Sequence, residues 1–401
     1  MTSSNQNVYV GIDTHADTHH VAVIDELGRK LGDQEFPTTR LGYRQLLTFI
    51  HTFGALLRIG VEGTASYGAG LTAYLRAQHI LVREIIRPNR QARRKGKSDP
   101  IDAYAAARVV AVDEELPIPK LLGGQVDLIR VTLKTRATAV KARTAAITQI
   151  KNFLITAPAE LREAYTALST ERLIAALAQP SSTPDDQIVR ALCRLANRVE
   201  FLDDQVSAAD DDLAALTSEV APALTYAKEI GPVSAAQLLV TAGENPYRIT
   251  SKAAFAALCG VSPIPASSGK ITRHRLNRGG DRQANAALYR IVTVRKRYDQ
   301  RTQAYVAKRT AEGKTAREIT RCLKRYVANE VYTLITSPTE VPSVDDLRPL
   351  RQHHKIDLLY GFRTRALLVL TKLEGHTESE TVDSTPSLYP GIQRPVGSRG
   401  H

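Results

Sequence analysis

The sequence predicts an N-terminal α/β domain followed by an all-α region, and three observations support this division. In residues 8–112, short apolar runs alternate with stretches of helical apolar spacing. From about residue 124 to 216 the spacing is wholly helical, and a further helical domain runs from about 224 to 335. Hydrophobic residues make up 43% of the chain and charged residues 24%, which is typical of proteins that bury cores and excludes wholesale disorder. We expect domains at 1–115, 124–220 and 224–336, then a Pro-containing extension and disordered tail at 337–401.

The first domain is expected to contain five short strands and three helices. The strands are predicted at Val8–Asp13, His20–Asp25, Gln34–Pro37, Arg58–Glu62 and Ile80–Ile86. The helices are predicted at Thr39–Phe53, Tyr67–Gln78 and Ser98–Val112, the last with Pro100 in its first turn. Three strands followed by helix, strand, helix, strand and helix is the order of a ribonuclease-H-like domain.

The central helical region contains a seam of nine apolar positions that alternate between spacings of four and three residues. These positions are Ile188, Leu192, Leu195, Val199, Leu202, Val206, Ala209, Leu213 and Leu216. Such a pattern predicts a coiled coil. Its partner is either the stretch 126–154 of the same chain or a second copy, and the pattern does not choose between them.

The charge of the chain favours a polyanionic partner. Lys and Arg number 54 against 41 Asp and Glu, a net charge of +13. The segment from Lys270 to Arg325 holds 17 basic residues and only four acids. A second basic cluster contains Arg87, Arg90, Arg93, Arg94, Lys95 and Lys97. We interpret both as nucleic-acid contacts rather than a membrane surface, because neither alternates with an apolar face.

Other classes of protein are excluded by what the sequence lacks. The three cysteines are far apart, so neither a disulfide framework nor a zinc site is expected. The sequence has no apolar run of the ~18 residues that a membrane helix needs, and no phosphate-binding loop of the GxxxxGK[ST] type. The start lacks the pattern of a signal peptide, so we expect a cytoplasmic protein without a membrane partner.

Four acids occupy positions where they could share a site. Asp13 and Glu62 end the first and fourth predicted strands, and Asp99 and Asp102 lie three apart on one face of the helix after strand five. Clustered carboxylates repel one another unless they bind cations, and hard oxygen ligands suit Mg²⁺. We therefore predict a Mg²⁺ site, with two ions for phosphoryl transfer. We assign no role to His15, His19 or His20.

Three blocks around these acids resemble the signature blocks of the DEDD transposases. The blocks are Val10–Asp17, Glu62–Gly68 and Lys97–Ala103. That insertion-sequence family is called IS-one-ten and is related to the Piv DNA invertases. The resemblance implies a RuvC-like, Mg²⁺-dependent domain in which Asp13, Glu62, Asp99 and Asp102 are catalytic metal ligands.

A second region is similar to the same family over about 225–335. It starts at Glu229–Ala236, where a Gly turn between helices suggests a helix-hairpin-helix-like module. The stretch Ala257–Lys270 is similar to the family's serine block, which implies Ser268 as nucleophile, with Ser267 as the neighbouring alternative. Four cations, Lys270, Arg273, Arg275 and Arg278, would neutralise the charge on the attacked phosphate.

The resemblance implies a DNA recombinase that excises and inserts its own element in a prokaryotic cytoplasm, at the nucleoid during activity. It also implies a structured guide RNA and a homo-oligomer, a dimer or tetramer. Two alternative enzymes are a RuvC-like Holliday-junction nuclease, which would not need Ser268, and a Piv-type site-specific invertase. A binding protein with a decayed site is a third alternative, against which the intact set of four acids argues.

Overall fold

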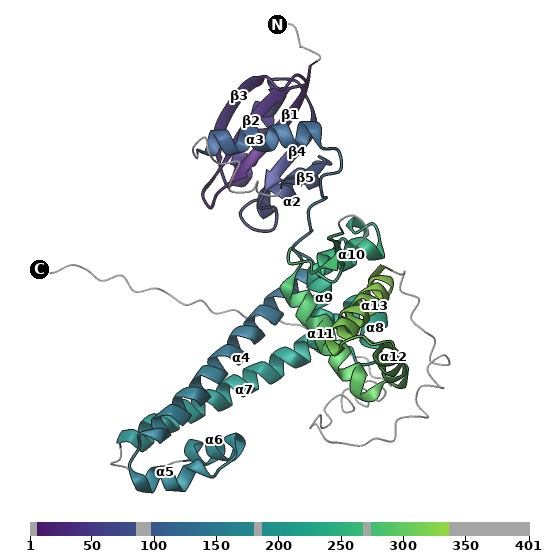
Figure 1. Ribbon diagram of the computed structural model, residues 1–401. Helices are drawn as coiled ribbons and strands as arrows, with labels where there is room; N and C mark the ends of the chain where they lie inside the picture. The colour runs from purple at the N-terminus through teal and green to yellow at the C-terminus, as the bar shows by residue number, and fades with distance from the viewer. Residues whose placement is uncertain (1–5, 86–97, 180–186, 268–273, 337–401) are drawn as a thin grey trace, which may run out of the picture. The chain divides into compact units, whose positions relative to one another are not determined.

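The computed structural model of the chain describes residues 6–85, 98–179, 187–267 and 274–336 (Figure 1). Three sets of predictions lie outside these residues: the basic cluster between Arg87 and Lys97, Ser268 with Lys270 and Arg273, and the tail at 337–401. Within the described ranges, none of the helices combines the length and the apolar character needed to cross a bilayer.

The N-terminal domain is a mixed α/β fold with the predicted order of elements. Its strands are β1 (Asn7–Thr14), β2 (Thr18–Asp25), β3 (Lys30–Pro37), β4 (Ala55–Glu62) and β5 (Val82–Ile85). Its helices are α1 (Arg40–His51), α2 (Ala69–Ala77) and α3 (Asp99–Val112). The strand β3 starts four residues earlier than predicted. It is an edge strand with most of its side chains exposed, so its first half shows no apolar alternation.

The sheet has the strand order β3-β2-β1-β4-β5. The central strand β1 runs antiparallel to β2 and parallel to β4, and β4 runs parallel to β5. This mixed sheet between helices is consistent with a ribonuclease-H-like domain. The parallel pairing aligns the carboxyl ends of β1 and β4, where Asp13 and Glu62 lie.

The alternation of side chains along β1 assigns its two faces to different helices. Val8, Val10 and Ile12 join the buried cluster that includes residues of α1 and α2. The other face packs against α3, which lies across the sheet (Figure 1). At Gly11 a Cβ atom would lie 2.1 Å from the backbone nitrogen of Ala107, so the missing side chain allows α3 to pack directly on β1.

The central region consists of α4 (Gln125–Ile155), α5 (Ala159–Thr166), α6 (Thr170–Ala178) and α7 (Gln187–Val220). The helices α4 and α7 pack along each other, so α7 contacts the in-chain stretch that was one of its two candidate partners. Their polar pairs run antiparallel, Gln125 with Glu219 and Arg136 with Asp210. Seam residues such as Leu192 and Leu213 are buried. Coiled-coil packing in the strict sense and self-association stay predictions.

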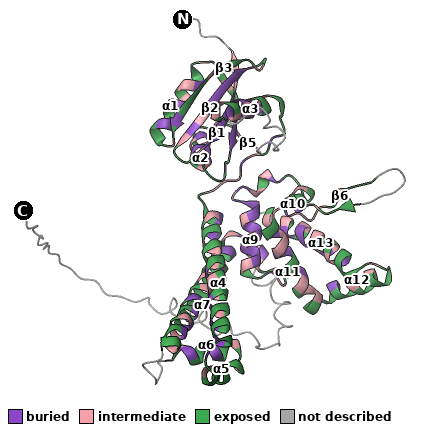
Figure 2. Cartoon of the chain, turned by 60° about the vertical axis from the view of Figure 1, so that its left-hand side comes forward, coloured by how far each residue is buried: buried purple, intermediate pink, exposed green. Residues whose placement is uncertain are grey.

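The C-terminal region is mostly helical. Its helices are α8 (Pro222–Thr225), α9 (Pro232–Ala242), the short η2 (Pro246–Arg248), α10 (Lys252–Leu258), α11 (Arg282–Tyr298), α12 (Gln300–Ala311) and α13 (Ala316–Thr336). Its buried core, coloured purple on the inner faces of the helices in Figure 2, contains Phe255, Leu288 and Val331. Within this domain, which the sequence predicts to be helical, the segment between α10 and α11 also contains a two-stranded ribbon, β6 (Ile264–Pro265) and β7 (His274–Arg275). Strands of two residues carry no detectable apolar period.

Candidate catalytic site

Asp13 lies near the end of β1 on the face that packs against α3. It is 2% exposed. The first turn of α3 carries Asp99 and Asp102, with Ser98 before the helix and Pro100 in its first turn. Carboxylates are favoured at a helix N-terminus, because its unpaired N–H groups carry partial positive charge. The fold therefore places two acids of α3 close to a buried acid of the sheet.

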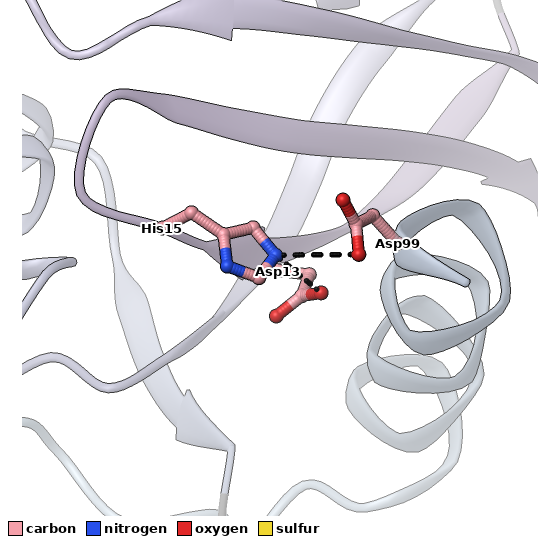
Figure 3. Close-up of side chains that lie close together, drawn as sticks. All are labelled: Asp13, His15 and Asp99. Atoms are coloured by element: carbon pink, nitrogen blue, oxygen red, sulfur yellow. Dashed lines mark ion pairs between the residues drawn. The ribbon is translucent and has the colours of Figure 1, made fainter. Parts of the chain in front are cut away.

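His15 completes this cluster (Figure 3). Its Nε2 atom lies 3.2 Å from Oδ2 of Asp13 and 3.3 Å from Oδ1 of Asp99. One donor atom from each of the three residues lies within 4.8 Å of the others, which is close enough for a single ion. From the sequence alone, His15 is assigned no role. The available signal was its position two residues after Asp13, where the chain has just left β1.

The pKa of Asp13 is raised above its ordinary value. The main cause is burial, which disfavours the charged carboxylate. His15 opposes the rise, while the nearby carboxylates of Asp102 and Asp99 add to it. Asp102 is therefore close enough to Asp13 to act on it electrostatically, as the sequence predicts. A bound cation would remove the repulsion among these acids.

Glu62 ends β4 beside Asp13. Because Ile12 pairs with Val61 and side chains alternate along parallel strands, Glu62 projects from the same face of the sheet as Asp13. Its side chain is buried, and its backbone oxygen accepts a hydrogen bond of 3.0 Å from Oγ1 of Thr14. Glu62 also lines a cavity of about 400 Å³ together with Glu84 of β5, an acid that the sequence analysis did not single out.

These residues fit a divalent cation. Asp13 and Asp99 supply oxygen donors within reach of one ion, and oxygen donors suit Mg²⁺. His15 adds a nitrogen donor, which is more usual for transition metals than for Mg²⁺. The pKa of Asp13 is raised, as expected for a buried acid whose negative charge is balanced only when a cation binds.

The serine region is described only in part. Ser267 lies just after β6, whereas Ser268, Lys270 and Arg273 lie outside the described residues. Arg275 in β7 and Arg278 after it are exposed. Arg87, Arg90, Arg93, Arg94 and Lys95 also lie outside the described residues, so their predicted role is untested.

Comparison with known proteins gives two matches in separate parts of the chain. A family model for the transposases with a DEDD domain of the IS110 (IS-one-ten) type matches residues 10–157. A second model, described as the transposases of the IS116/IS110/IS902 family, matches residues 221–307. No curated protein matches the chain. The first match contains Asp13, Glu62, Asp99 and Asp102, and the second contains the ribbon and Ser268.

Proposed function

The chain resembles the DEDD transposases of the IS110 family in both its α/β domain and its C-terminal domain, and we propose that it cuts and rejoins DNA at the ends of an insertion sequence. Transposase domains of this family imply an enzyme that cleaves and transfers DNA. The observation that carries the proposal is the juxtaposition of Asp13 and Asp99. These acids are 86 positions apart in sequence, yet both lie about 3.2–3.3 Å from one imidazole nitrogen inside the first matched region.

The proposed metal ligands are Asp13, Glu62, Asp99 and Asp102. Divalent cations such as Mg²⁺, when bound, supply positive charge for the phosphate oxygens that gain charge during strand cleavage. The fold positions these four acids. Asp13 and Glu62 lie at the adjacent ends of β1 and β4, and Asp99 and Asp102 lie in the first turn of α3. Because Asp13 is buried and Gly11 allows α3 to pack closely on β1, these positions have little freedom to move.

The proposed nucleophile is Ser268. Its Oγ would form a bond to the phosphorus while the bond from phosphorus to the leaving strand breaks, and the hydroxyl proton passes to the leaving oxygen. One phosphodiester replaces another, so the bond energy is kept for rejoining. Basic side chains near the ribbon, Arg275 and Arg278 among them, would stabilise the charge that develops on the phosphate.

We further propose the partners that the resemblance implies. A structured guide RNA would choose the DNA sequence by base pairing, while the basic segment Lys270–Arg325 contacts nucleic-acid backbones. A dimer or tetramer would combine the α/β domain of one subunit with the serine domain of another.

The test is an end-joining assay in cells that carry the chain together with its native flanking DNA. We expect junctions between the element ends with wild type, with Ser267→Ala, and with Asp17→Ala, which removes an exposed acid near the site. We expect none with Asp99→Ala, Asp102→Ala or Ser268→Ala. Junction formation by Ser268→Ala would refute the serine mechanism in favour of a metal-only nuclease. Junction formation by Asp99→Ala would refute the acidic site.

A further inference from the structure

A cavity of about 470 Å³ lies beside the ribbon in the C-terminal domain. Three cations line it, Arg278, Arg282 and Lys324, together with Asn285 and Tyr289. No acidic side chain contributes to its walls. The residues come from the loop after β7, from the start of α11 and from α13, so the fold gathers them from distant parts of the sequence.

Close backbone packing builds this cavity. A Cβ atom on Gly280 would lie 2.2 Å from the backbone nitrogen of Gly260, so position 280 requires glycine for this approach. Gly260 also has a φ of +67°, which favours glycine. The Asp281 N–H donates a 2.7 Å hydrogen bond to the Leu258 carbonyl, which joins the loop to the end of α10. The loop after β7 is therefore fixed against α10.

Asn285 holds the lysine of the cavity in place. Its Nδ2 atom donates to the carbonyls of Cys259 and Gly260 at 3.1 and 3.0 Å. Its Oδ1 atom accepts a 2.7 Å hydrogen bond from Nζ of Lys324. Because both ends of the amide are engaged, Lys324 is directed to the cavity by a defined network and not by chance.

The positive charge of the cavity has no counter-charge in the part of the chain that the structure describes. None of its three cations forms an ion pair there. Burial and the neighbouring Arg321 lower the pKa of Lys324. Arg282 is the first residue of α11, where the helix end is itself positive. The closest acid in sequence, Asp281, is engaged in capping α11 and in a 2.7 Å hydrogen bond with Thr241.

We propose that this cavity binds a backbone phosphate of the DNA strand that is cut, with the ring of Tyr289 against the adjoining sugar or base. Lys and Arg without an acidic neighbour are the usual contacts to phosphate, and an exposed aromatic ring is the usual contact to an unpaired nucleotide. Tyr289 is 54% exposed. Arg278 follows β7 by three residues, so along the chain the cavity is separated from the ribbon by only a short segment. The proposal rests on the proposed function, since it assigns the C-terminal domain a cut DNA strand.

The test measures binding of the full-length protein to a fluorescent single strand of the element end, over a range of salt concentrations. We expect Arg278→Gln and Lys324→Gln each to reduce the slope of log affinity against log salt by roughly 0.7, the value for one lost phosphate contact on a single strand. Lys324→Arg should retain wild-type binding. The control is Lys141→Gln, which removes an exposed lysine from α4, outside both the cavity and the basic segment Lys270–Arg325. Equal loss in the control would overturn the proposal, because it would show only a general effect of charge.

A set of strands with one neutral methylphosphonate each identifies the phosphate. At one position the methylphosphonate should weaken binding by the wild-type protein. It should not change binding by Arg278→Gln, because that variant already lacks the contact. If no position behaves in this way, the cavity does not hold a backbone phosphate. If inorganic phosphate binds to the cavity and the DNA strand does not displace it, the cavity is a site for small anions. That result would also overturn the proposal. The binding measurement does not require end joining, so a failure of the cavity proposal can be told apart from a failure of the proposed recombination in the end-joining assay.

Discussion

His15 Nε2 lies 3.2 Å from Oδ2 of Asp13, and the same nitrogen lies 3.3 Å from Oδ1 of Asp99. The imidazole thus contacts an acid of the sheet and an acid of α3 at once. A protonated His15 favours the ionised form of Asp13, whereas burial and the other two acids oppose it. The net result is a raised pKa for Asp13, so its charge is a cost to the folded protein unless a cation is present.

Asp13→Asn should therefore stabilise the chain at neutral pH in the absence of divalent cations. A carboxyl group with a raised folded-state pKa costs no stability below its ordinary pKa of 3.8, and the cost develops as the pH rises through the folded-state pKa. We expect the melting temperature of the variant to exceed that of wild type by about 4–8 °C at pH 7, the shift that ~1 kcal/mol produces in a domain near 100 residues, and to equal it at low pH. Thermal melts in chelator at several pH values measure this. A variant less stable than wild type at pH 7 would contradict the electrostatic account.

His15→Ala should have the opposite effect, and only when Asp13 is present. Loss of the imidazole removes the interaction that lowers the pKa of Asp13, so the variant should melt at a lower temperature than wild type at pH 7. In the Asp13→Asn background the same substitution should change little. Equal effects of His15→Ala in both backgrounds would show that His15 acts by packing alone.

Gly11→Ala should displace α3 and with it Asp99 and Asp102. The added methyl group would lie 2.1 Å from the backbone nitrogen of Ala107 and 2.2 Å from the carbonyl oxygen of Ala103, and backbone atoms of a helix cannot yield separately. We expect a loss of about 1–3 kcal/mol in the free energy of unfolding and loss of end joining. Gly231→Ala is the control, since nothing lies within 4 Å of its Cβ position. A folded and fully active Gly11→Ala protein would refute the proposed packing of α3.

The predictable part of the fold and site followed from local periodicity and from position along the chain. The alternation in β1 and the turn chemistry before α3 were enough to place Asp13 at a strand end and Asp99 in a first helical turn. The role of His15 could not be predicted, because it depends on how closely α3 approaches β1, which Gly11 determines. Lys324 was equally hidden, since only the tertiary fold brings α13 to the loop after β7. Whether α7 pairs within its own chain or with a second copy could not be predicted, because a heptad seam does not specify its partner.

Tyr104→Phe should weaken the attachment of α3 to the edge of the sheet. The buried Tyr104 hydroxyl donates a 2.9 Å hydrogen bond to Oδ1 of Asp33 in β3. We expect the free energy of unfolding, measured in urea at pH 7, to fall by roughly 0.5–1.5 kcal/mol. Burial, and then the contact with Asp33, raise the pKa of Tyr104 to about 12 from an ordinary value of 10.0. The stability that this pKa shift contributes to the folded protein is present below pH 10 and is lost as the pH rises towards 12. The pH dependence in that window should disappear in Tyr104→Phe, and its persistence would assign it to another group.

Exchange of charges between α4 and α7 tests whether the two helices pair within one chain. Arg136 donates to both carboxylate oxygens of Asp210, at 2.5 and 2.9 Å, and both side chains are only partly exposed. Arg136→Asp alone places two acids opposite each other and should cost about 1–2 kcal/mol, while the swap Arg136→Asp with Asp210→Arg should recover most of it. Thermal melts measure both, and the recovery should be independent of protein concentration because the pair lies in one chain. Recovery that grows with concentration would instead place α4 against α7 of a second copy.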